Sequence, residues 1–197
     1  MKNGIGFGVA ACLSAAFLVY SGLDWQWAKY SEYAVVLQYI GIPSVFMGIL
    51  VPVAMPVYFY ANPSTDAALV KTSSKAFLVA LSCSTLIKAF TNRIPREPFT
   101  SLGLVDFSQQ FRIGFLQGET LWESLIEGFP SGHTMTAFAM SVALLPLIQN
   151  QNLRRAAILY ALYMGFGVSV TVHWLSDAVA GGLIGVAIGK LIARNVS

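Results

Sequence analysis

Two short segments of the chain hold its only two histidines, and both have residue types that could do chemistry. Residues 128–133 read Gly-Phe-Pro-Ser-Gly-His and end at His133, whereas residues 173–177 read His-Trp-Leu-Ser-Asp and begin at His173. Each segment lies where a hydrophobic run meets polar residues. Because histidine exchanges its proton near physiological pH, this placement predicts proton transfer or nucleophilic chemistry. The alternative is that both are interfacial histidines with structural hydrogen bonds.

The spacing around each histidine suggests a role for it. His173 and Asp177 are four residues apart and would share one face of a helix. Asp177 would then accept the Nδ1 proton of His173 and leave Nε2 free as a nucleophile. Ser131, Gly132 and His133 begin a hydrophobic run, and the unpaired N–H groups of a helix start favour a bound anion.

Three cations end an earlier hydrophobic run, namely Lys88, Arg93 and Arg96. With two histidines and a helix start, they predict a site for phosphoryl transfer, in which one histidine attacks and the other protonates the leaving oxygen. Taken singly, the lysine is explained by snorkelling and the arginines by lipid headgroups. A zinc site is a weaker alternative because no third nitrogen or sulfur ligand is nearby. We therefore predict neither a metal nor a cofactor.

The composition is that of a membrane protein. Of the 197 residues, 56% are hydrophobic and 11% are charged, against about 25% charged in soluble domains. The net charge of +3 is small and spread along the chain, which argues against a nucleic-acid partner. Cys12 and Cys83 lie in apolar runs without metal-ligand spacing. Length and composition predict one integral membrane domain over residues 1–197.

We expect an all-α bundle of six transmembrane helices, over residues 4–23, 33–61, 76–94, 131–148, 156–172 and 176–193. The first run has a rival interpretation as a cleaved signal peptide, although no clean cleavage site follows it. The polar segment 95–127 would form a loop at the outer face, with a short interfacial helix within 120–129. Gly181, Gly185 and Gly189 recur every four residues in the last run, a pattern that lets helices approach closely.

The charges at the ends of these runs predict the topology. One set of flanks holds seven Lys and Arg residues with one acid, Asp66, whereas the other holds eight of the nine acids. By the positive-inside rule the first set is cytoplasmic, together with both termini. Both histidines and Lys88 then lie together on the outer side.

The chain resembles the type 2 phosphatidic acid phosphatases, the PAP2 superfamily. Residues 130–133, Pro-Ser-Gly-His, are similar to the second family signature, and His173 with Asp177 to the later half of the third. Lys88, Arg93 and Arg96 resemble a variant of the first. The resemblance implies that Lys88 with Arg93 or Arg96, Ser131 and Gly132 bind phosphate. It further implies that His133 is the general acid, His173 the nucleophile that forms a phosphohistidine, and Asp177 its orienting partner.

Two departures from the family pattern stand out. The second arginine of the first signature is displaced by one position, because the seventh residue after Lys88 is Pro95. The arginine of the third signature is replaced by Gly167. We expect Arg112 to supply the missing phosphate contact from the outer loop. The alternative is that Arg112 pairs with one of the nearby acids.

The resemblance implies a metal-independent phosphatase of phospholipid metabolism, with no soluble insertion and hence a bacterial inner-membrane protein. Its partners would be membrane lipids and a lipid phosphate substrate, such as phosphatidic acid, phosphatidylglycerol phosphate, undecaprenyl diphosphate or a lipid A phosphate. Two alternatives remain open, a lipid phosphotransferase using the same histidine and a catalytically silent protein that binds lipid phosphate. The choice of lipid and the oligomeric state do not follow from the sequence.

Overall fold

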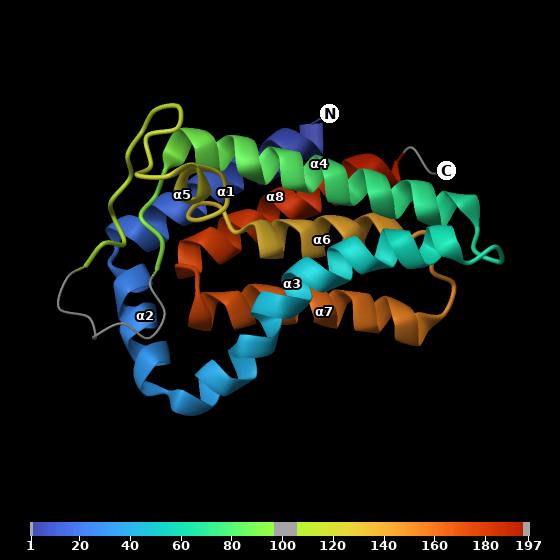
Figure 1. Ribbon diagram of the computed structural model, residues 1–197, viewed down its shortest axis with the longest axis horizontal. Coiled ribbons are helices and arrows are strands. Elements are labelled where there is room, and N and C mark those ends of the chain that lie inside the picture. Colours follow the sequence, from blue (N-terminus) through green and yellow to red (C-terminus); the bar gives the residue numbers. More distant parts are fainter. Residues whose placement is uncertain (1, 97–105, 195–197) are drawn as a thin grey trace.

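A computed structural model of the chain describes residues 2–96 and 106–194, and this described part is helical, with no strand (Figure 1). This confirms the all-α class; residues 97–105 of the predicted outer loop lie outside the described part. The helices are α1 Lys2–Tyr20, α2 Leu23–Tyr33, α3 Val35–Ala61, α4 Ala67–Thr91, α5 Leu121–Leu125, α6 Gly132–Leu144, α7 Gln151–Thr171 and α8 Leu175–Ala193.

Each of the six predicted spans corresponds to one long helix, but several ends differ. Helix α4 begins at Ala67 rather than near 76, because the Asp66 carboxylate accepts the Ala68 N–H at 2.8 Å and caps the helix. Helix α6 ends at Leu144 rather than near 148. Pro146 follows, and because proline has no backbone N–H, it cannot donate the hydrogen bond that would continue the helix.

The number of membrane crossings is only partly established. By length and composition α3, α4 and α8 can cross a membrane, and α1 from Gly6 together with α2 forms a bent pair, at 70°, that counts as a fourth candidate. Helix α6 has 13 residues, or about 20 Å at 1.5 Å per residue, against a hydrocarbon core of about 30 Å. The chain is therefore consistent with an integral membrane protein, and the six-span count stays a prediction.

Helix α2 is an element that the sequence analysis did not predict. It follows a turn at Gly22, whose φ of 77° is easily adopted only by glycine. Asp24, Ala28 and Ser31 are its buried residues, and their spacing places them on one face of the helix. This face turns toward the bundle, where α2 contacts α7 and α8. Figure 1 shows α2 at the same end of the molecule as α5.

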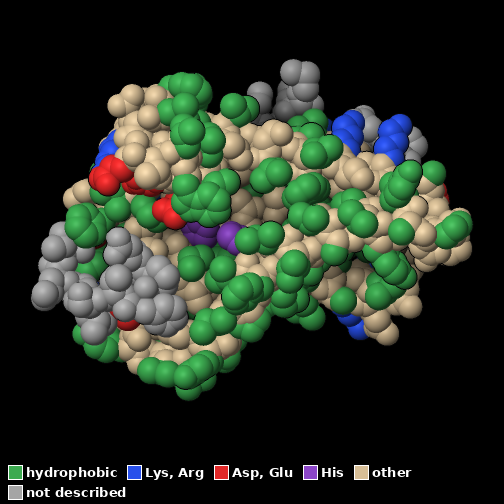
Figure 2. Space-filling view, in the orientation of Figure 1, with side chains coloured by type: hydrophobic (Ala, Val, Ile, Leu, Met, Phe, Trp, Pro, Cys, Tyr) green, Lys and Arg blue, Asp and Glu red, His purple; other side chains and the backbone are tan. Residues whose placement is uncertain are grey.

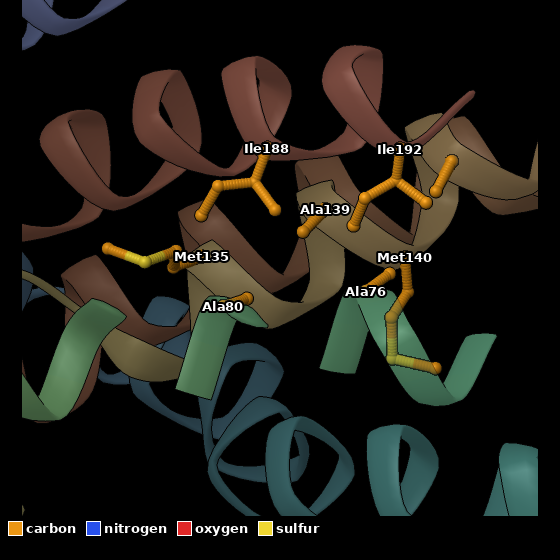
Figure 3. Packing of buried hydrophobic residues seen from close by; sticks show 8 residues of the cluster. Ala76, Ala80, Met135, Ala139, Met140, Ile188 and Ile192 are labelled. Atoms are coloured by element: carbon orange, nitrogen blue, oxygen red, sulfur yellow. The ribbon is translucent and has the colours of Figure 1, made fainter. Parts of the chain in front are cut away.

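Helix α6 lies at the centre of the bundle, in contact with α3, α4, α7 and α8. Its core partners are mostly small or flexible side chains, which let helices pack closely. Figure 3 shows the main cluster, in which α4 contributes Ala76 and Ala80, α6 contributes Met135, Ala139, Met140 and Ala143, and α8 contributes Ile188 and Ile192.

The glycines of α8 allow it to lie directly against α6, as their spacing predicts. A Cβ atom added at Gly181 would come within 2.5 Å of the Ser131 carbonyl oxygen, and one at Gly185 within 2.5 Å of the Met135 carbonyl oxygen. The backbones of the two helices therefore nearly touch along two turns. Since α6 and α8 begin with the histidine segments, this packing determines how far apart the two histidines lie.

We expect Gly185→Ala to destabilise the protein by about 1–3 kcal/mol, because the new methyl group is forced against α6 backbone. Gly8→Ala in α1 is the control, since nothing lies within 4 Å of a Cβ atom added there, and alanine favours a helix over glycine by about 1 kcal/mol. Thermal unfolding of both purified variants in detergent measures the difference. Equal midpoints for the two variants would contradict the packing described.

Candidate active site

The site is built where the first turns of α6 and α8 meet. The Ser131 side chain caps α6 by accepting the Thr134 N–H at 3.4 Å. The backbone N–H of Ser131 donates to the Asp177 carbonyl oxygen at 3.0 Å. The start of α6 is therefore bonded directly to the first turn of α8.

The two histidines face each other across this junction. The ring centroids of His133 and His173 are 5.8 Å apart, with the ring planes at 67°. Nε2 of His133 is buried and has no hydrogen-bond partner. Helix α3 packs against the His133 ring at Gly48, where an added Cβ would come within 2.4 Å of the ring. Two imidazoles at this distance can both reach one phosphoryl group.

Asp177 contacts His173, as the four-residue spacing predicts. Its Oδ2 lies 3.4 Å from Nδ1 of His173 and accepts the Trp174 N–H at 3.2 Å. The contact to His173 is long, as catalytic hydrogen bonds often are before substrate binds. Burial lowers the pKa of His173 and the bond to Asp177 opposes that shift. The imidazole is therefore neutral at neutral pH and remains so at pH values somewhat below the ordinary pKa of histidine. In its neutral form it can act as a nucleophile.

Lys88 reaches the same junction from α4. Its Nζ donates to the Gly128 carbonyl oxygen at 2.8 Å, and the residue is 3% exposed. A Cβ added at Gly132 would lie 4.0 Å from the Cε of Lys88. The ammonium group is therefore held beside the first turn of α6, where it adds a positive charge to the helix N-terminus.

Arg93 lies fully buried between two carboxylates. It donates from Nη2 to Asp24 Oδ2 at 2.7 Å and from Nη1 to Asp177 Oδ1, and it also bonds to Ser176 Oγ at 2.6 Å and to the Ser108 carbonyl oxygen. All three charged groups have no exposed surface. Both terminal nitrogens are thus occupied by protein acceptors, and Nε is buried without a partner.

Asp24 is a site residue that the sequence analysis missed. Besides Arg93 it binds Ser176, accepting the backbone N–H at 2.7 Å and the hydroxyl. The available signal was that Asp24 is the first acid of the chain and follows a hydrophobic run. No motif marks it, because its partners lie far away in the sequence.

Arg96 is also buried and also occupied. It donates to the Ser169 carbonyl oxygen at 2.8 Å, to the Ala28 carbonyl oxygen at 3.2 Å and to Ser31 Oγ at 2.9 Å. Burial lowers its pKa to about 10, so the guanidinium keeps its charge at neutral pH. Arg96 therefore ties α2 to the end of α7.

The position of the absent family arginine is closed by helix packing. A Cβ added at Gly167 would come within 2.4 Å of Ser44 Oγ and 2.5 Å of Ser44 Cβ, on α3. Helices α3 and α7 cross here at close range. An arginine side chain therefore has no room unless α3 moves away.

Arg112 pairs with nearby acids, which was the alternative interpretation of this residue. It donates to Glu119 at 2.9 Å and to Glu123 at 3.2 Å, and its side chain is 34% exposed. Both terminal nitrogens are therefore held by outer-loop acids. The predicted contact with phosphate is untested, and it would require Arg112 to leave at least one of these acids.

These features define a helical protein of membrane character with a histidine–histidine–aspartate site at one end of the bundle. A family model described as the PAP2 superfamily matches residues 74–197, and the chain belongs to this superfamily. The matched range includes α6, α7 and α8 with both histidines and Asp177. The match confirms the resemblance drawn from the signatures, and it indicates phosphatase activity on phosphate esters.

Comparisons of the chain with curated proteins and with solved structures gave no match. In the described part of the chain, no group of three or more His, Cys, Asp or Glu side chains is arranged to hold a metal ion.

We expect Arg112→Ala to change kcat/KM by less than about tenfold, because partly exposed ion pairs contribute only about 0–1 kcal/mol. Glu123→Gln, which removes one partner, should have a similarly small effect. Phosphate release by both variants and the wild type measures this. A loss of about 10²-fold or more for Arg112→Ala alone would instead support a direct contact with phosphate.

Proposed function

We propose that the protein is a metal-independent phosphatase that removes phosphate from a lipid phosphate or diphosphate through a phosphohistidine at His173. The observation that carries the proposal is the placement of His173 between Asp177 and the ring of His133. Asp177 holds Nδ1 of His173 at 3.4 Å, and the His133 ring stands 5.8 Å from the His173 ring. One imidazole is thereby oriented for attack, with a second beside it for proton transfer.

In the first half-reaction, Nε2 of His173 attacks the phosphorus atom. The bond from phosphorus to the ester oxygen breaks, and that oxygen takes a proton from Nε2 of His133. The Nδ1 proton of His173 stays directed at Asp177, whose charge stabilises the imidazolium that forms. A lipid monophosphate thus releases an alcohol, and a lipid diphosphate releases a lipid monophosphate. In both cases the leaving oxygen carries the proton from His133.

The second half-reaction restores the enzyme with water. Nε2 of His133, now neutral, accepts a proton from a water molecule as its oxygen attacks phosphorus. The phosphorus–nitrogen bond breaks, His173 becomes neutral again, and inorganic phosphate is released. His133 therefore acts first as an acid and then as a base, as one group can in two successive steps.

The phosphoryl oxygens would be held by the first turn of α6 and by Lys88. The N–H groups of Gly132 and His133 in the first turn of α6 would point toward the anion, whereas the N–H of Ser131 is bonded to the Asp177 carbonyl oxygen. Lys88 stands beside Gly132 and would exchange its bond to the Gly128 carbonyl oxygen for one to phosphate. Helix dipole and ammonium together supply positive potential where charge develops.

A lipid substrate is supported by the surroundings of the histidines. Figure 2 shows part of the histidine side chains at the surface of the bundle, between acidic side chains and hydrophobic ones. The flanking helices expose large apolar residues, with Phe46 of α3, Leu86 of α4 and Phe90 of α4 each more than half exposed. In a bilayer these residues would face acyl chains, so a phosphate carried on a lipid could enter laterally.

The outer face of an inner membrane is the location that the charges favour. On the face in Figure 2, most Lys and Arg side chains lie at the end of the bundle away from the histidines, and acidic side chains lie near the histidines. Cytoplasmic segments are enriched in Lys and Arg. The site would therefore face the periplasm, with both termini in the cytoplasm. Exposed Trp122 and Phe115 near α5 support an interfacial role for this segment.

One observation favours a second function, that of a silent protein that binds lipid phosphate. Arg93, Arg96 and Arg112 all have their terminal nitrogens bonded to protein acceptors, so the described site offers Lys88 as its cation. A phosphotransferase is the other alternative, and it differs only in the acceptor of the phosphoryl group.

We expect the wild type to release inorganic phosphate from a panel of lipid phosphates with EDTA present, and His173→Ala to lose about 10³-fold or more, because no other group forms the covalent intermediate. Acid-sensitive label from ³²P-lipid should appear on the wild type only. A silent protein would bind lipid phosphate without turnover, and a transferase would label a second lipid. Substantial turnover by His173→Ala would rule out the proposed nucleophile.

His133→Ala separates the acid from the nucleophile. A lipid alkoxide needs a proton to leave, so its hydrolysis should fall by about 10²–10⁴-fold. p-Nitrophenyl phosphate has a leaving group that needs none, so its loss should be much smaller. Equal losses on both substrates would contradict the role of His133.

The topology is tested by single cysteines at Thr120 and at Asn152, both exposed positions, in a chain with Cys12 and Cys83 replaced by alanine. An impermeant maleimide should label Thr120→Cys from the periplasmic side and Asn152→Cys only after the inner membrane is opened. The proposed topology has an odd number of membrane crossings between Thr120 and Asn152. Labelling of both cysteines from the same side would reject it.

A further inference from the structure

We propose that Asp24 is a positioning residue for the His173 nucleophile, and that it acts through Arg93, which orients Asp177 instead of binding phosphate. The inference rests on the proposed phosphatase function. Asp24 lies on α2, outside the residues that match the family. It would therefore be a contribution of the N-terminal part of this chain to a site whose signatures all lie later.

The contacts form an unbroken path to the nucleophile. Asp24 Oδ2 accepts from Arg93 Nη2 at 2.7 Å, and Arg93 Nη1 donates to Asp177 Oδ1. The other oxygen of Asp177 faces His173 Nδ1 at 3.4 Å. Each carboxylate is thus held by the same guanidinium, whose planar fork fixes the angle between them. A rotation of Asp177 would break its bond to Arg93, so the direction of the bond to His173 is determined.

A second path runs through the backbone. Asp24 Oδ1 accepts the N–H of Ser176 at 2.7 Å, and Asp24 Oδ2 accepts the hydroxyl of the same residue. Ser176 is in the first turn of α8, one residue before Asp177. Asp24 therefore caps α8 from another helix and favours the helix N-terminus with its charge. The Asp24 carboxylate therefore fixes the position of the backbone at the start of α8 as well as that of the Asp177 side chain.

The surroundings of Arg93 keep it in this role. Its guanidinium carbon lies 4.9 Å from the centroid of the Phe111 ring and 5.5 Å from that of the Trp174 ring. With both terminal nitrogens bonded and no exposed surface, the side chain has little freedom to turn toward a substrate. The structure therefore assigns Arg93 to binding the two carboxylates and not to binding phosphate.

The charged groups around His173 determine how Asp24 affects catalysis. They are Lys88 from α4, Arg93 after α4 and Asp177 from α8, with His133 of α6 as the neighbouring titratable ring. Burial, then Lys88 and, to a smaller extent, Arg93 lower the pKa of His173, and Asp24 offsets the charge of Arg93. Without Asp24, the acidic limb of the pH profile of kcat/KM should move to lower pH, because neutral His173 persists further.

The test is Asp24→Asn in the full-length protein in detergent. We expect kcat to fall by about 10-fold or more, while KM and the inhibition constant of inorganic phosphate change by less than about threefold. The acidic limb should move to lower pH. The matched control is Asp66→Asn, because Asp66 also caps a helix by accepting a backbone N–H, at Ala68 on α4, but on the exposed surface. The control should leave kcat and the limb unchanged.

Arg93→Met and the double variant complete the cycle. If Asp24 acts through Arg93, the double variant should be little worse than Arg93→Met alone. Should Asp24→Asn not fold, Asp24→Glu keeps the charge but displaces the carboxylate, and kcat should fall without a shift of the limb.

Three results would overturn the inference. An unchanged kcat for Asp24→Asn, or for Asp24→Glu where that variant replaces it, would remove the positioning role. A large rise in the inhibition constant of phosphate for Arg93→Met, with kcat little changed, would make Arg93 a phosphate ligand. A wild type without turnover on any lipid phosphate would reject the proposed function and the inference with it, whereas an active wild type with a normal Asp24→Asn rejects the inference alone.

Discussion

The buried ion pairs of Arg93 with Asp24 and Asp177 are the constraint on which the rest of the site depends. A charge without exposed surface is tolerated only when it is paired and hydrogen-bonded, because its desolvation costs several kcal/mol. Arg93 can satisfy that requirement only if α2, the segment after α4 and the start of α8 come together at one point. Buried ion pairs often stabilise a fold no more than a hydrophobic cluster of equal volume does, but these contacts can form only in one arrangement of the three elements. The direction of Asp177 toward His173 follows from that arrangement.

Close backbone packing determines the remaining dimension of the site. The glycines of α8 bring it against α6, and the N–H of Ser131 bonds to the Asp177 carbonyl oxygen. Neither histidine can shift along its helix without disturbing this packing, since cores deform little. The separation of the two rings is therefore a property of the helix interface. The charge network sets orientation and the glycine interface sets distance.

The parts of this structure that could be predicted from the sequence are those that depend on local pattern. Hydrophobic runs predict the long helices, and the spacing of His173 and Asp177 predicts their contact because both lie within one turn of the α8 start. Helix α2 mixes polar and apolar residues, so no hydrophobic run reveals it in the sequence. Asp24 binds Ser176, which lies 152 positions later, so no local pattern predicts this contact. The partners of Arg93 lie on α2 and α8, and only tertiary packing brings them to it. For Arg112 the sequence offered a nearby acid as an alternative, but the outer loop has several and the pattern does not choose among them.

The charge balance at the junction bears on how a phosphate would be bound there. Lys88 and Arg93 carry two positive charges, and Asp24 and Asp177 carry two negative ones, so the buried cluster has no formal excess. A lipid phosphate entering this site would bring uncompensated negative charge, which the α6 N-terminus offsets only in part. In the proposed mechanism His133 is the acid, and the added negative charge would favour the proton that this role needs. Substrate binding would thus itself create the acid that the first half-reaction needs, and the two histidines would be in different protonation states only when substrate is present.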